Sequence, residues 1–124
     1  MDWRKNYRNV MTYAAGCDKY FEDKMRELGK EKITTFFSDL GTAEWYGEKA
    51  VNETYRDVVG SWIGDYKYFS EFVLALNWKC WYWYDRDNNL SRLYSDLFYK
   101  AKDKFYSHYK DNQEACDYFF ELTD

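Results

Sequence analysis

The densest group of metal-binding residue types lies in the second half of the chain, at residues 85–89 and just beyond. Four side chains match in spacing the ligand positions of an EF-hand calcium loop: Asp85, Asp87, Asn89 and Asp96. That loop needs a glycine at its sharp turn, where this chain has Leu90. Because Leu90 also begins an apolar helical pattern, the stretch favours an exposed turn and a capped helix start over a calcium site.

Other catalytic chemistry has little support in the residue pattern. A zinc site needs several histidine, cysteine or carboxylate ligands, and the single histidine, His108, lies on the polar flank of a predicted helix. Acid–base catalysis needs two carboxylates in one apolar cleft, and no spacing selects a pair among the four candidates Asp39, Glu44, Asp57 and Glu71. There is no glycine-rich phosphate loop and no serine nucleophile elbow. We therefore expect no enzyme activity, no cofactor and no metal.

Aromatic residues give the clearest indication of a function. The chain has 6 tryptophans, 14 tyrosines and 9 phenylalanines, which are 23% of its residues, and it has no proline. Tyrosine and tryptophan combine a large apolar area with a polar tip, so an excess beyond the needs of a small core is typical of contact surfaces. The lack of proline favours a chain that is mostly helix with short connections. Together these features predict an all-helical binding protein.

Helical spacing of apolar residues predicts the elements that must position these rings. A long amphipathic helix is expected from Trp3 to Leu28, followed by a linker over residues 35–41 and a single turn from Ala43 to Tyr46. Further helices are predicted over 51–63, 66–84, 90–109 and 111–122, with Asp65 as an N-cap and Asp111 with Glu114 as a capping box. Since residues 66–84 are apolar on all sides, they belong at the centre. The predicted fold class is all-α: a compact helical bundle of about five main helices with a long N-terminal helix.

Charge divides the chain near residue 32. Residues 1–32 hold eight Lys or Arg and six Asp or Glu, whereas residues 33–124 hold ten and sixteen. We therefore divide the single domain into an N-terminal helical extension, 1–32, and a helical bundle core, 33–124. The acidic core favours a basic protein partner and makes direct nucleic-acid binding unexpected. No signal peptide follows Met1, and the longest apolar run is too short for a membrane span, so we expect a cytoplasmic protein.

Two contact surfaces are predicted. The first combines the acidic turn with the tyrosines of the helix end beside it: Tyr82, Tyr84, Asp85 and Asp87. Its carboxylates would speed the approach of a basic partner, and its tyrosines would hold the complex. The second is the N-terminal stripe that begins with Trp3, Tyr7 and Val10, to which we assign assembly or partner choice.

About ninety residues, 35–124, resemble a family of small uncharacterised proteins carried by phages and conjugative elements of gut bacteria. The resemblance rests on residues 36–47, 52–55, 62, 65–68, 73–79, 81 and 118–124. The family has no assigned activity, so the resemblance implies a context and assigns no site residues. Small acidic proteins of mobile elements often block host defence, which leads us to expect an anti-CRISPR-like inhibitor of a bacterial defence nuclease in the host cytoplasm. The alternatives are a structural or accessory protein that forms a homo-oligomer through its N-terminal helix, and a protein that sequesters a small ligand in an aromatic pocket.

Overall fold

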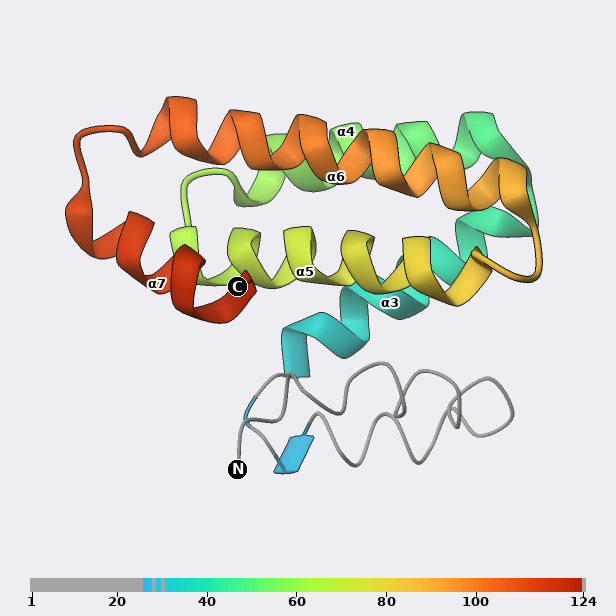
Figure 1. The fold of residues 1–124 in the computed structure, drawn as a ribbon, viewed down its shortest axis with the longest axis horizontal. Helices are drawn as coiled ribbons and strands as arrows, with labels where there is room; N and C mark the ends of the chain where they lie inside the picture. The colour runs from blue at the N-terminus through green and yellow to red at the C-terminus, as the bar shows by residue number, and fades with distance from the viewer. Residues whose placement is uncertain (1–25, 28, 30, 124) are drawn as a thin grey trace.

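The computed structural model describes residues 26, 27, 29 and 31–123 (Figure 1). Five α-helices follow one another through this part of the chain, which contains no strand: α3 (Glu31–Glu44), α4 (Glu48–Trp62), α5 (Tyr66–Trp83), α6 (Asn88–His108) and α7 (Gln113–Thr123). The prediction of a compact all-α bundle is confirmed. None of these helices has the length and apolar character that a membrane crossing requires.

The predicted N-terminal helix falls almost entirely outside the described residues. Trp3, Tyr7 and Val10, to which we assigned assembly, all lie there, so that assignment stays a prediction. At the end of the segment, Gly29 has a φ of 70°, and its N–H donates to the carbonyl of Arg26 at 3.0 Å. A positive φ is the conformation expected of a glycine that ends a helix.

Helix α5 is the centre of the bundle, as its apolar sequence predicts. Every residue from Phe69 to Leu76 is buried, as are Trp78 and Lys79. The other four helices all pack against it, and α6 runs beside it in the opposite direction (Figure 1). Because the middle of α5 is covered by other helices, its buried polar residues must find partners within the protein.

Helix α3 corrects the prediction of a linker over residues 35–41 and of a separate turn after it. The segment is helical from Glu31 to Glu44, and one stripe of it is buried: Ile33, Phe36, Leu40 and Ala43. The Phe36 ring packs edge-on against Phe72 of α5, with centroids 5.1 Å apart. Threonine, serine and glycine in this segment are weak helix formers, but burial of the stripe outweighs a propensity cost of about 1 kcal/mol or less per residue.

Side chains that accept backbone N–H groups fix where the later helices begin. Asp65 accepts from the N–H of Tyr68 at 3.2 Å and starts α5 as predicted. The capping box proposed for α7 is wrong by one residue, because Asn112 accepts from the N–H of Ala115 at 3.1 Å. Glu114 instead accepts from the Tyr66 hydroxyl at 3.1 Å, which ties α7 to the start of α5.

Candidate functional site

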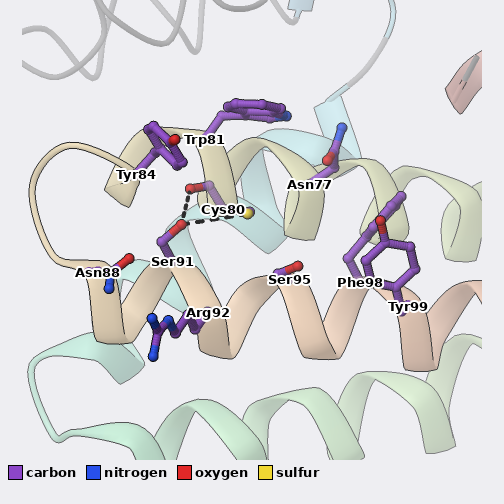
Figure 2. Close-up of a pocket in the computed structure, with 10 residues that line it drawn as sticks. All are labelled: Asn77, Cys80, Trp81, Tyr84, Asn88, Ser91, Arg92, Ser95, Phe98 and Tyr99. Atoms are coloured by element: carbon purple, nitrogen blue, oxygen red, sulfur yellow. Dashed lines mark hydrogen bonds between the residues drawn. The ribbon is translucent and has the colours of Figure 1, made fainter.

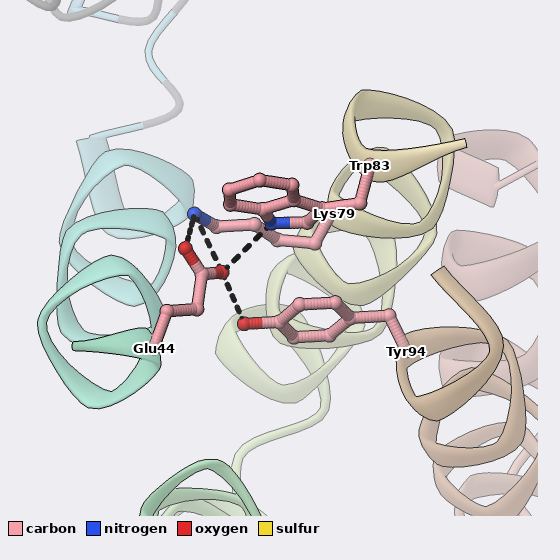
Figure 3. Close-up of polar contacts among 4 residues, drawn as sticks. All are labelled: Glu44, Lys79, Trp83 and Tyr94. Carbon is pink, nitrogen blue, oxygen red and sulfur yellow. Dashed lines mark hydrogen bonds and ion pairs between the residues drawn. The ribbon is translucent and has the colours of Figure 1, made fainter. Parts of the chain in front are cut away.

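The α3–α4 turn and the α5–α6 loop lie at the same end of the bundle, where a buried group of polar side chains connects them (Figures 1 and 3). We call this group the Glu44 cluster; its members are Glu44 at the end of α3, Lys79 and Trp83 on α5, and Tyr94 on α6. Lys79 Nζ lies 3.1 Å from Glu44 Oε2 and 3.3 Å from Oε1. Trp83 Nε1 donates to Oε2 at 3.1 Å, and the Tyr94 hydroxyl donates to the same oxygen.

The Glu44 cluster is largely shielded from solvent: Lys79 and Tyr94 are buried, and Glu44 and Trp83 are partly buried. The Lys79 side chain is 4% exposed and that of Glu44 is 10% exposed. Both charged groups are therefore largely removed from solvent, and the ion pair between them offsets part of that desolvation cost. Lys79 Nζ also lies 4.0 Å from the centroid of the Phe37 ring, within reach of a cation–π contact. Burial, with the nearby Glu44 carboxylate as the next cause, raises the pKa of the Tyr94 phenol far above its ordinary value. Tyr94 therefore stays protonated and acts as a donor.

This arrangement holds helices in place. Its one carboxylate already accepts from three donors on two other helices, so we assign the cluster a positioning role. Of the other carboxylates considered for acid–base chemistry, Asp39 and Asp57 are exposed, whereas Glu71 is buried. Glu71 precedes Lys79 by eight residues on α5, or roughly 12 Å along the helix axis. The two buried carboxylates thus belong to different regions of the core.

Directly after Glu44 come the two large aromatic side chains that are the most exposed among the described residues. Trp45 is 89% exposed and Tyr46 is 80% exposed. Their backbone is well defined: the N–H groups of Trp45 and Tyr46 donate to the carbonyls of Thr42 and Ala43 at 3.2 and 3.0 Å. Gly47 then has a φ of 102°, a conformation that side chains strongly disfavour. We call this segment the Trp45–Tyr46 turn.

The Trp45–Tyr46 turn is anchored on both sides. Glu44, the residue before it, is held by the Glu44 cluster, and the carbonyl of Gly47 after it accepts from the N–H of Val51 in α4 at 3.2 Å. Two large rings therefore project into solvent from a backbone that is already ordered. Such a surface loses little conformational freedom when it binds, and Trp and Tyr are among the residue types that contribute most to protein interfaces.

The structure gives the four residues of the predicted partner surface different roles. Tyr84 and Asp85 are exposed. Tyr82 is half-buried and packs edge-on against Trp83 at a centroid distance of 5.0 Å, with the Arg86 guanidinium 4.5 Å from its ring. Asp87 is the N-cap of α6. Tyr84 and Asp85 are thus the two fully exposed members of this surface, and its role as a partner contact stays a prediction.

Sequence reasoning missed Trp45 and Tyr46. They were placed in a single turn after a predicted linker, and no contact role was assigned to them. The one available signal was the glycine directly after them, because Trp-Tyr-Gly at a helix end leaves an aromatic pair on a tight turn. Their exposure depends on how α3 packs, which the local sequence does not reveal.

A groove beside this end of the bundle runs between α5 and α6 and has a volume of about 330 Å³ (Figure 2). The aromatic residues that line it are Trp81 on α5, Tyr84 at the C-cap of α5, and Phe98 and Tyr99 on α6. Ser91 also lines the groove, and its hydroxyl donates to the carbonyl of Cys80 at 2.9 Å. Within the described residues, no group of three or more metal-ligating side chains is present.

Comparison of the chain with protein-family models, with curated proteins and with solved structures finds no match.

Replacing Asp87 should reveal its structural role. Its carboxylate accepts from the N–H groups of Asn89 and Leu90 at 3.1 and 3.2 Å, so Asp87→Ala should lower the free energy of unfolding by about 0.5–2 kcal/mol in urea titration. Asp87→Asn should keep most of the stability, because asparagine is an equally good cap. Asp85→Ala is the matched control at an exposed carboxylate and should change stability by no more than about 0.5 kcal/mol. Equal losses for Asp87→Ala and Asp85→Ala would contradict this assignment.

Proposed function

We propose that this chain is a non-enzymatic binding protein whose main contact with a protein partner is the Trp45–Tyr46 turn. The observation that carries the proposal is the exposure of these two rings, 89% and 80%, on a backbone held by hydrogen bonds. Large rings in water are unfavourable for an isolated protein, and exposed apolar surface of this kind often marks an interaction site. Burial against a partner would remove that cost and supply a centre for the interface.

The charge of the bundle indicates what kind of partner fits. Residues 111–124 contain five Asp or Glu and no Lys or Arg, so most of the acidic excess of the core lies on or next to α7. On α7, the exposed residues Glu114, Asp117 and Glu121 accompany the exposed ring of Phe120. An acidic surface speeds association with a basic protein, while buried aromatic contacts slow its release.

The most specific form of the proposal names the partner class. A basic surface that an acidic protein could occupy is typical of a nuclease, whose nucleic-acid channel carries positive charge. We propose an inhibitor of a bacterial defence nuclease, acting in the cytoplasm of the host of a phage or conjugative element. Its support consists of the acidic surface, the exposed aromatic turn and the resemblance described above.

Phage infection assays can test this function. The full chain would be expressed in bacteria that each carry one defence system, and phage plating efficiency would be measured. We expect one system to lose its activity with the wild-type chain and to regain it with the double variant Trp45→Ala/Tyr46→Ala. Tyr68→Ala, an exposed tyrosine near the other end of α5, is the matched control and should inhibit like the wild type.

Two outcomes would overturn the proposal. If no defence system loses activity, the chain is not an inhibitor of the nucleases in the panel, and the named partner class is wrong. If a system is inhibited equally by the double variant, the Trp45–Tyr46 turn is not the contact. Circular dichroism of each variant excludes unfolding as the cause of lost inhibition.

A further inference from the structure

The exposed sides of α6 and α7 carry opposite charge. Residues 99–110, which are the C-terminal half of α6 and the two residues after it, contain four lysines and one carboxylate, that of Asp103. Residues 111–124 contain five carboxylates and no basic residue. The buried sides of the two helices meet where the ring of Phe105 stacks on that of Phe119, with centroids 4.3 Å apart. The charged residues lie mainly on the opposite, exposed sides.

Two lysines on α6 and two carboxylates on α7 have the same spacing. Lys100 and Lys104 are four residues apart, and so are Asp117 and Glu121. At that spacing two side chains lie on one side of a helix, about 6 Å apart along its axis. All four side chains are exposed. Within the described part of the chain neither lysine forms an ion pair or a side-chain hydrogen bond, and the two carboxylates receive one, from the Gln113 amide to Asp117 at 2.7 Å.

An exposed aromatic ring accompanies each charged pair. Tyr99, which is 60% exposed, directly precedes Lys100. Phe120, which is 58% exposed, directly precedes Glu121. One residue corresponds to a rotation of about 100° around a helix axis, and an antiparallel pair of helices is related by a two-fold axis. If the two helices of different copies lie antiparallel with Lys100 opposite Glu121, both rings therefore fall on the same edge of the contact.

We propose that α7 of one copy of this chain docks antiparallel on α6 of a second copy. Lys100 then lies opposite Glu121, and Lys104 lies opposite Asp117. A second copy fits because both halves of the contact are present in this chain, with opposite charge and equal spacing. A nucleic-acid strand would also meet the lysines, but the five carboxylates of residues 111–124 would repel its phosphates.

The contact should be weak. Exposed ion pairs contribute little individually, and one helix from each copy covers less than the roughly 800 Å² per partner that is typical of a stable complex. Self-association is therefore expected only at high protein concentration. The inference does not rest on the proposed function, because the Trp45–Tyr46 turn lies toward the other end of the bundle (Figure 1). The carboxylates of α7 cannot face a second copy and a basic partner at the same time.

Sedimentation velocity of the full chain, up to millimolar concentration, tests the proposal. We expect reversible association at low ionic strength that becomes about tenfold or more weaker at high ionic strength. The variants Lys100→Glu/Lys104→Glu and Asp117→Lys/Glu121→Lys should each stay monomeric, because both sides of the contact then carry the same charge. An equimolar mixture of the two variants should associate again, because each face of one variant is complementary to a face of the other.

A matched control separates the contact from total charge. Lys49→Glu/Arg56→Glu makes the same change in charge at exposed residues of α4 and should associate within about threefold of the wild type. All replaced side chains are exposed, so the variants should remain folded, which circular dichroism would check.

Three results would overturn the proposal. The first is a wild-type chain that stays monomeric at millimolar concentration and low ionic strength. The second is a mixture of the two charge-reversed variants that stays monomeric. The third is a monomeric chain that binds a fluorescent single-stranded DNA and loses this binding in Lys100→Glu/Lys104→Glu, which would assign the lysines to a phosphate backbone.

Discussion

Replacing Glu44 with alanine should lower the free energy of unfolding by about 3–5 kcal/mol. The variant leaves the ammonium group of Lys79, whose side chain is only 4% exposed, without the carboxylate that pairs with it. It also removes the acceptor for the Trp83 indole N–H and the Tyr94 hydroxyl. A buried charge that loses its ion-pair partner is among the costliest defects that a single substitution can create. Urea titration monitored by circular dichroism would measure the loss.

Two further variants separate the charge from the other contacts. Tyr94→Phe removes one donor and leaves the ion pair intact, so its cost should be about 1.5–3 kcal/mol. The double variant Glu44→Gln/Lys79→Met removes both charges. Its loss of unfolding free energy should be smaller than the sum of the losses for Glu44→Gln and Lys79→Met alone. Additive losses, or a cost below about 1 kcal/mol for Glu44→Ala, would show that the charges are not coupled as described.

Phe105→Ala should have a comparable effect, a loss of about 3–5 kcal/mol, for a different reason. The Phe105 ring is fully buried and stacks on Phe119 of α7 with centroids 4.3 Å apart. On its other sides it lies 6.3 Å from the ring of Phe69 on α5 and 4.8 Å from that of Tyr109. Truncation would open a cavity where α5, α6 and α7 meet, and rings on three sides limit how far it can collapse.

The neighbouring residue provides the control for Phe105→Ala. Tyr106 lies at the surface with 36% of its area exposed, so Tyr106→Ala should cost clearly less in the same urea titration. Two results would contradict the packing of α7 on the Phe105 ring: equal losses of stability for both variants, or a loss below about 1 kcal/mol for Phe105→Ala.

The sequence was sufficient for those helices whose apolar stripe is continuous. The patterns over 51–63, 66–84 and 90–109 match α4, α5 and α6 closely, because strong helical periodicity dominates local variation. Helix α3 was missed because the weak helix formers Thr34, Thr35, Ser38 and Gly41 favoured a linker, although the residues between them form an apolar stripe with helical spacing that α5 buries. Tertiary packing therefore decided the one element that local propensity left undefined.

The candidate site could not be predicted for the same reason. Glu44 and Lys79 are 35 positions apart, and they meet only because α3 extends as a helix to the end of α5. Because residues 35–41 were predicted to be a linker, the helix that ends directly before Trp45 and Tyr46 was absent from the predicted fold. The acidic turn at 85–87 was predicted to be a contact surface because of its composition. One of its two carboxylates, that of Asp87, caps α6. Local composition predicted a contact surface without showing which aromatic residues would form it.

The most direct test of the central proposal is the affinity of the Trp45→Ala/Tyr46→Ala variant for the purified defence nuclease that the infection assays identify. Because hot-spot residues each contribute about 2 kcal/mol or more, the double variant should bind at least about 100-fold more weakly than the wild type. Its melting temperature should stay close to that of the wild type, since both side chains project into solvent. Binding as tight as that of the wild type, by a variant that remains folded, would contradict the proposal that the Trp45–Tyr46 turn is the principal contact.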